Sequence, residues 1–211
     1  QIKSFIKIII FSIILLSIYM TFYSSDFSLV NLRPIFFNVI SILTGTGYVA
    51  GEFDMWGNFP LVFFLSLMFI GGCAGSTTCG IKIFRIQILY AFVLNQLKKI
   101  IYPKGIFLIK YDKNTVDEKF MASIISFIFL YLVIFFLLTA FLTLSGLDFV
   151  TSISGAATSI SNVGPGLGST IGPSGNFANL PEVSKWILSF GMILGRLELF
   201  AILVLFLPSF W

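Results

Sequence analysis

The stretch Ser41-Ile42-Leu43-Thr44-Gly45-Thr46-Gly47-Tyr48 decides how the rest of this sequence is interpreted. It is short, rich in hydroxyl groups and interrupted by glycines, and it lies between two runs apolar enough to sit in lipid. Extended backbone at membrane depth is tolerated only where it is buried in protein or lines a watery cavity. Gly45 and Gly47 can adopt positive φ angles, so successive carbonyls can turn toward a common axis and replace the hydration shell of a cation. The stretch therefore predicts one segment of an ion-conducting pore.

The composition is that of an integral membrane protein. Hydrophobic residues make up 57% of the 211 positions and charged residues only 10%, whereas soluble domains carry about 25% charged residues. The absence of histidine disfavours a hydrolytic or metal enzyme, and the net charge of +4, spread along loops, does not indicate nucleic-acid binding. Cys73 and Cys79 lack the partners of a disulfide framework or zinc site, so we expect two reduced packing residues.

Three apolar runs are long enough to cross the hydrocarbon core, which takes about 20 residues. They are Ile2–Tyr23, Phe120–Leu144 and Trp186–Leu207. Lys3 and Lys7 place the start of the first run in the cytoplasm by the positive-inside rule. The most basic loop, with six lysines between residues 98 and 119, belongs on the same side. We therefore expect a multi-pass protein of the plasma (bacterial inner) membrane with both termini cytoplasmic.

Two shorter runs cannot span. The first is expected to begin with Asn31 as its N-cap and Pro34 in its first turn, and to end near Ile42, after about 17 Å. The second begins with Asp148 as its cap and covers Phe149–Ile160. Each run leads directly into a glycine-rich segment. Both are therefore predicted to be re-entrant pore helices that end at filter-like strands.

The run from Trp56 to Lys99 is too long for one span. Its 44 residues would extend about 66 Å as a helix, roughly twice the hydrocarbon thickness. The small and polar residues of the segment Gly71–Thr78 interrupt it in the middle. We expect a break there in mid-membrane, with its backbone satisfied by cavity water or by neighbouring helices.

The two halves of the chain repeat. A shift of 117 residues places Asn31 on Asp148, Gly47 on Gly164 and the first span on the third, and internal repeats are common in transport proteins. The predicted fold is an all-α polytopic membrane protein made of two span–pore-helix–span repeats. Its parts are a membrane repeat at 1–99, a cytoplasmic basic loop at 100–118 and a second membrane repeat at 119–211.

Several stretches resemble the superfamily of K⁺ transporters that includes the Trk, Ktr and HKT proteins. The matching pieces cover nearly the whole chain and are Thr44-Gly45-Thr46-Gly47-Tyr48, Gly71-Gly72-Cys73-Ala74-Gly75-Ser76-Thr77, Ser161-Asn162-Val163-Gly164-Pro165-Gly166-Leu167-Gly168, Gly195-Arg196-Leu197-Glu198 and Leu207-Pro208-Ser209-Phe210-Trp211. The family has four span–pore–span repeats around one pseudo-fourfold pore. This chain resembles the third and fourth of them, the C-terminal half of a TrkH protein.

The resemblance implies roles for particular residues. The filter glycines fall on Gly47 and Gly164, and the flanking carbonyls would be the ion ligands. Those carbonyls belong to Leu43, Thr44, Gly45, Thr46, Ile160, Ser161, Asn162 and Val163. The family's intramembrane gate loop falls on Gly71, Gly72, Cys73, Ala74, Gly75, Ser76, Thr77 and Thr78. No cofactor is implied beyond the transported K⁺, which would be the metal at the filter.

Arg196 falls on the family's pore-facing arginine. An arginine near the bilayer centre costs several kcal/mol unless it faces water or a partner, and Glu198, two residues on, points to a different helix face. We therefore expect Arg196 to face the pore and to meet the loop at Gly71–Thr78. Two alternatives remain open for Glu198: it pairs with Lys82 or Arg85, or it lines the inner vestibule.

Two filter segments cannot close a ring around an ion. The other two are expected from the same longer protein, which a first residue of Gln rather than Met favours, or from a second copy in a homodimer. The resemblance also implies a cytoplasmic nucleotide-binding regulatory subunit that docks on the basic loop. The expected function is K⁺ uptake; the alternatives are a Na⁺-permeable or Na⁺-coupled transporter and, more remotely, a membrane-embedded enzyme or assembly factor.

Overall fold

Two of the predicted spans are present as continuous helices. The computed structural model describes residues 1–23, 29–105, 107–111 and 114–211, with the backbone alone at 29–31 and 114. Within that part of the chain, α1 (Ile2–Tyr23) and α5 (Glu118–Leu144) are the helices long and apolar enough to cross a membrane. Both match their predicted limits within two residues.

The two short runs form α2 (Leu29–Thr44) and α6 (Phe149–Ser161). Asp148 caps α6 as predicted, because its carboxylate accepts a hydrogen bond of 3.1 Å from the Thr151 amide. The cap predicted for α2 is wrong: the helix begins two residues before Asn31, and Pro34 lies beyond the first turn. A proline there gives up a single backbone hydrogen bond, so the helix can continue upstream. Most of the predicted outer connection, residues 24–30, lies outside the described residues, as does the Asn31 side chain.

The overlong run is broken as expected. It forms η1 (Phe53–Trp56), α3 (Asn58–Met68) and α4 (Ile83–Ile101), and residues 69–82 between the last two are not helical. The two ends of this break lie side by side, since the Gly71 amide donates to the Ile81 carbonyl and the Ile81 amide donates to the Phe69 carbonyl, both at 2.9 Å. The break is therefore a closed loop rather than a loose linker.

The basic loop carries a two-stranded hairpin. Strands β1 (Lys110–Tyr111) and β2 (Asn114–Thr115) pair antiparallel, with Lys110 opposite Thr115. A small apolar cluster of Ile88, Met121 and Ile124 joins α4 to the start of α5 beside it. Two of the charges predicted for this loop, at positions 112 and 113, lie outside the described residues.

The last predicted span is not one helix. After η2 (Phe177–Asn179), the chain forms α7 (Glu182–Arg196), α8 (Leu199–Val204) and η3 (Pro208–Phe210). The prediction of a continuous helix over Trp186–Leu207 is wrong because Glu198 adopts a left-handed conformation, with φ of 57°. The carboxylate at this break forms ion pairs with Lys82 and Arg85.

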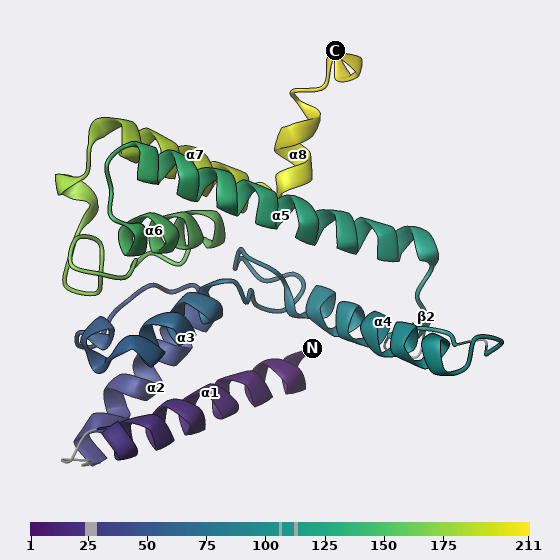
Figure 1. Cartoon of the computed structure of the whole chain (residues 1–211), viewed down its shortest axis with the longest axis horizontal. Helices are drawn as coiled ribbons and strands as arrows, with labels where there is room; N and C mark the ends of the chain where they lie inside the picture. Colours follow the sequence, from purple (N-terminus) through teal and green to yellow (C-terminus); the bar gives the residue numbers. More distant parts are fainter. Residues whose placement is uncertain (24–28, 106, 112–113) are drawn as a thin grey trace.

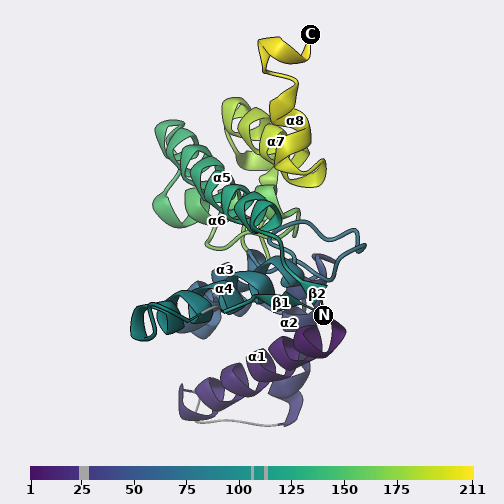
Figure 2. The same cartoon turned by 90° about the vertical axis from the view of Figure 1, so that its right-hand side faces the viewer.

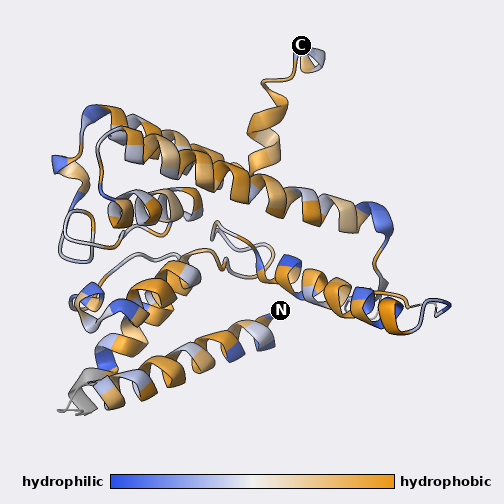
Figure 3. Cartoon of the chain, viewed as in Figure 1, coloured by the Kyte–Doolittle hydropathy of each residue, from blue (hydrophilic) through white to orange (hydrophobic). Residues whose placement is uncertain are grey.

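The elements form two stacked layers (Figures 1 and 2), with α1 to α4 in one and α5 to α8 in the other. One apolar core joins them, and in it Phe69 meets Phe135 of α5 edge to face at 4.9 Å. Apolar residues also cover much of the outside of the helices (Figure 3), for example Phe11 and Phe22, which are 63% and 88% exposed. Such surfaces suit contact with lipid or with further protein rather than with water.

Candidate functional site

The ends of α2 and α6 bring the two predicted filter segments into direct contact. The segment after α2 carries Gly47, and the segment after α6 carries Gly164. A Cβ placed on Gly164 would lie 3.4 Å from the Cα of Gly47, and one placed on Gly47 would overlap the carbonyl oxygen of Val163. The two strands therefore meet backbone to backbone, at a distance that only glycine permits.

The backbone of both segments alternates in handedness. In the first, φ is 66° at Gly45 and 78° at Gly47; in the second, φ is 51° at Asn162 and 117° at Gly164. The residue between each pair, Thr46 or Val163, has negative φ. Alternating left- and right-handed residues turn successive peptide planes the same way, so that neighbouring carbonyls can point to one side of the strand. This is the backbone arrangement that a row of cation ligands needs.

The same hydrogen bonds hold both segments at the 117-residue shift. The amide of Thr46 donates to the Ser41 carbonyl at 2.9 Å, and that of Val163 to the Thr158 carbonyl at 3.1 Å. One residue earlier, Gly45 and Asn162 donate to the equivalent carbonyls of Ile42 and Ser159, at 3.1 and 3.2 Å. Two sequences with few identical side chains thus fold in the same way at the ends of two helices.

Buried polar side chains of the short helices fix the strands, and these residues were missed from the sequence. Ser41 Oγ donates to the Tyr48 carbonyl at 2.6 Å, and Thr158 Oγ1 accepts from the Gly164 amide at 2.9 Å. Further along the first strand, the side chain of Asn38 forms two hydrogen bonds of 2.8 Å with the backbone of Ala50: Nδ2 donates to the carbonyl, and Oδ1 accepts from the amide. Polar residues at full burial in otherwise apolar helices are the signal that would have found them.

A side chain of α5 contacts the segment after α6 and helps to hold it. The Tyr131 hydroxyl lies 2.7 Å from Ser161 Oγ, and Tyr131 is only 1% exposed. On the other side, the side-chain amide of Asn162 (Nδ2) donates to the Met192 carbonyl of α7 at 3.0 Å. The strand after α6 is therefore held by the helices that precede and follow it.

The predicted gate loop lies directly against the first strand. A Cβ placed on Gly45 would lie 3.5 Å from Thr78 Cγ2. Inside the loop, the Gly72 amide donates to Thr78 Oγ1 at 2.8 Å, and Ser76 Oγ lies 2.7 Å from the same hydroxyl and donates to the Cys73 carbonyl at 2.6 Å. The loop thus has a defined conformation, held by its own hydroxyl groups.

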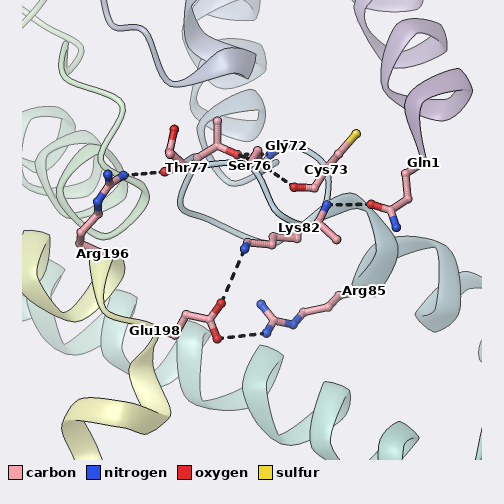
Figure 4. Close-up of polar contacts among 11 residues, drawn as sticks. Gln1, Gly72, Cys73, Ser76, Thr77, Lys82, Arg85, Arg196 and Glu198 are labelled. Carbon is pink, nitrogen blue, oxygen red and sulfur yellow. Dashed lines mark hydrogen bonds and ion pairs between the residues drawn. The ribbon is translucent and has the colours of Figure 1, made fainter.

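Charged residues connect this loop to the break between α7 and α8 (Figure 4). Arg196 Nη1 donates to the Thr77 carbonyl at 2.5 Å, so the predicted meeting of Arg196 with the loop is present. Glu198 lies 3.6 Å from Lys82 Nζ and 3.8 Å from Arg85 Nη2. Of the two alternatives for Glu198, the ion pair with Lys82 and Arg85 is the one the geometry supports.

Two carboxylates belong to the elements next to the strands: Asp54 lies in η1 and Asp148 caps the start of α6. The hydrogen bond from Thr151 holds the pKa of the Asp148 carboxyl below its usual range. Burial raises the pKa of Asp54, which follows the first strand in η1. Asp54 Oδ2 lies 2.6 Å from where a Cβ of Gly172 would sit, so this carboxylate packs closely against the loop that follows the second strand.

The described residues include no group of three His, Cys, Asp or Glu side chains that could hold a metal ion. Cys73, inside the gate loop, and Cys79, directly after it, are both free thiols. The two strands carry backbone carbonyls and a few hydroxyl groups, and carbonyl oxygens are the groups that can replace the hydration shell of a cation.

Known proteins are similar to this chain in sequence and in fold. The family described as "TrkH: Cation transport protein" matches residues 4–211. The Trk system potassium uptake protein TrkI of Halomonas elongata is 44% identical over 86% of this chain and 37% of its own length, and TrkH of the same organism is 33% identical over 98% and 42%. These relatives are named as uptake proteins, not as enzymes.

The crystal structure of the potassium transporter TrkH from Vibrio parahaemolyticus superimposes with a TM-score of 0.91 at 30% identity. The match covers 99% of this chain and 44% of that one. The chain thus spans about two fifths of the length of the relatives it matches. With the family match over nearly every residue, the chain belongs to the TrkH family of cation transport proteins.

Proposed function

We propose that this chain supplies two of the four filter segments of a membrane pathway for potassium uptake. The observation that carries the proposal is the meeting of Gly47 and Gly164, with alternating backbone handedness on both strands. Membership of a cation transport family supports it, as do relatives named as potassium uptake proteins. Glycine at both positions favours K⁺ over the sodium-permeable alternative, in which serine would stand at a filter position.

The proposed architecture is two span–pore-helix–span repeats, at residues 1–99 and 119–211, joined by a cytoplasmic loop at 100–118. The hydrogen bonds repeated at a shift of 117 residues support the equivalence of the two halves. The same relation supports an arrangement in which both short helices would point their C-terminal, negative ends toward the filter. Two such repeats make half of a pseudo-fourfold pore.

Ions would cross the filter through the carbonyl oxygens of residues 43–46 and 160–163. Backbone carbonyls replace the water that a potassium ion loses on entry, and the fixed strand geometry limits how well a smaller ion is held. The driving force would be the inside-negative membrane potential, which supplies about 2.3 kcal/mol per charge per 100 mV. Side chains such as Ser41 and Thr158 then act by holding the strands rather than by touching the ion.

Residues 71–78 would be the gate. The contact between Thr78 and the first strand supports a position immediately below the filter. The hydrogen bond from Arg196 to the Thr77 carbonyl would tether the loop there, and the guanidinium would add a positive barrier to cations. Opening then requires this bond to break or the last helix to move with the loop.

The remaining filter segments would come from further parts of the same protein or from a second copy of the chain in a homodimer. The assembly would lie in the plasma membrane, with the N-terminal and C-terminal ends of this segment in the cytoplasm. There the basic loop, with Lys98, Lys99 and Lys104 before the β1–β2 hairpin, is the proposed dock for a nucleotide-binding regulatory subunit. Its lysines would meet acidic side chains of that partner.

Growth of a potassium-uptake-deficient bacterium on limiting K⁺ tests the proposal. The assembled transporter should restore growth, and the variant Gly164→Asp should not, because it places a carboxylate where the two strands meet. Gly146→Asp is the matched control: Gly146 also has positive φ, 92°, but a Cβ there contacts nothing within 4 Å. Equal growth with Gly164→Asp and the wild type, at equal amounts of protein in the membrane, would refute the filter assignment.

A further inference from the structure

The loop at Gly71–Thr78 and the α7–α8 break line a cavity beside the proposed gate. Its volume is about 130 Å³, and it is lined by the hydroxyls of Ser76, Thr77 and Thr78 and by the charges around Glu198. One water molecule needs only about 10–15 Å³ of such volume. The cavity therefore has room for several waters, or for a small solute together with water.

Positive charge dominates the walls of this cavity. Lys82, Arg85 and Arg196 all line it, whereas Glu198 is the single carboxylate among its described lining residues. That leaves an excess of two positive charges. The side chains of Lys82 and Arg85 are only 18% and 14% exposed, so water screens them poorly and an uncompensated charge there is costly.

The one carboxylate does not saturate these cations. Its oxygens lie 3.6 and 3.8 Å from the Lys82 and Arg85 nitrogens, beyond the usual length of a charge-assisted hydrogen bond, which is about 2.7–2.9 Å. For comparison, the exposed pair of Lys185 with Glu182 closes to 2.8 Å. Among the described residues, the Lys82 ammonium accordingly donates no hydrogen bond within the chain, although it carries three donors.

Arg85 is fixed in place by its other contacts. Its guanidinium lies 3.8 Å from the centre of the Phe127 ring, which holds it against α5. Arg196 is fixed by its bond to Thr77. Figure 4 shows Lys82 and Arg85 reaching Glu198 from one side while Arg196 lies across from them. The cations are thus preorganised around a space.

We propose that this cavity binds a small inorganic anion, of the class of chloride or phosphate. The anion would accept hydrogen bonds from the Lys82 ammonium, and it would neutralise part of the excess charge. Since one wall is the gate loop and another is the α7–α8 break, a bound anion would also hold these two elements together. That last consequence rests on the proposed function of the loop as a gate, whereas the binding itself does not.

Thermal unfolding of the purified, assembled transporter tests the binding. Chloride, and separately inorganic phosphate, would replace the bulkier gluconate at constant potassium and constant ionic strength. A ligand that binds only the folded state raises the unfolding midpoint until its site is saturated. We expect the unfolding midpoint to rise and then saturate as the anion is added. In Lys82→Gln the apparent Kd should be about tenfold or more higher. In the control Lys185→Gln, which removes an ion-paired lysine elsewhere, the apparent Kd should be unchanged.

A variant of opposite sign separates binding from mere structural damage. Glu198→Gln removes the only carboxylate of the cavity, so it should lower the apparent Kd for the anion even if it lowers the midpoint itself. If Lys82 and Glu198 had only a structural role, anion binding would be weakened alike in both variants. Bromide, soaked into crystals of the same protein, should give an anomalous peak beside Lys82.

The proposal is overturned if all variants respond to chloride and phosphate as the wild type does, or if none responds and no bromide peak is found. Potassium uptake measured on the same preparations keeps the two proposals apart. Normal uptake without anion binding would remove this inference alone, and anion binding without any uptake would instead remove the transport assignment.

Discussion

Replacing Gly47 by alanine tests the strand contact with the smallest possible change. The Cβ of Gly47→Ala would overlap the Val163 carbonyl oxygen, which is a backbone atom and cannot rotate away. Both the overlap and the positive φ of 78° oppose the substitution. Either strand must shift, and with it the carbonyls that are proposed to bind potassium.

The magnitude follows from separating the two costs. A left-handed conformation costs an alanine about 1–2 kcal/mol, and overpacking adds typically about 1–3 kcal/mol. Gly146→Ala is subject to the first cost alone, because φ is 92° there and a Cβ contacts nothing within 4 Å. The difference between the two variants should therefore be about 1–3 kcal/mol, which corresponds to roughly 5- to 150-fold in an equilibrium or a rate.

The assay is initial K⁺ uptake by potassium-depleted cells that carry the assembled transporter, scaled to the amount of protein in the membrane. Gly146→Ala should retain most of the wild-type rate, and Gly47→Ala should lose at least about fivefold, at the low end of that range. Equal rates in the two variants would show that the contact between the strands does not matter for transport, and the reasoning would fail.

Three further predictions concern the gate, the support of the second strand and an outer cap. Arg196→Met removes the donor to the Thr77 carbonyl, so uptake should rise several-fold; unchanged or lower uptake in a well-folded variant counts against the tether. Tyr131→Phe leaves the buried Ser161 hydroxyl without its partner and should lower the free energy of unfolding by about 1–2 kcal/mol, and an unaltered thermal midpoint would contradict this. Contacts with Thr151, first with its side chain and then with its capping amide, lower the pKa of Asp148, so its contribution to stability is present at neutral pH and is lost as the pH falls below about 4, through the folded pKa. The thermal midpoint of Asp148→Asn should therefore fall less between neutral and acidic pH than that of the wild type. Parallel plots of thermal midpoint against pH for the two proteins would refute this prediction.

The sequence was sufficient for features that depend on local patterns. Hydropathy predicts the limits of α1 and α5 within two residues. The excess length of the run that begins at Trp56 predicts the break before α4. Asp148 predicts the start of α6, because it is a favourable N-cap. The glycines at 47 and 164 could be matched by their spacing alone. Each of these signals lies within one element, or in a simple shift between two.

What failed depends on contacts between distant residues. No proline lies near Glu198 to predict the break; its positive φ accompanies ion pairs with Lys82 and Arg85, more than a hundred residues earlier. Likewise, the hydrogen-bond partner of the buried Tyr131 hydroxyl is Ser161, in another helix. Such residues look like ordinary members of apolar or charged runs until the fold brings their partners to them.

The central claim is that the two strands form part of one cation filter. Anomalous diffraction from crystals of the assembled transporter grown in rubidium, which replaces potassium in carbonyl sites, measures this most directly. We predict peaks on the pore axis that are coordinated by carbonyl oxygens from both 43–46 and 160–163. Rubidium bound elsewhere along the pore, with neither strand in contact in a protein that still transports potassium, would contradict the account.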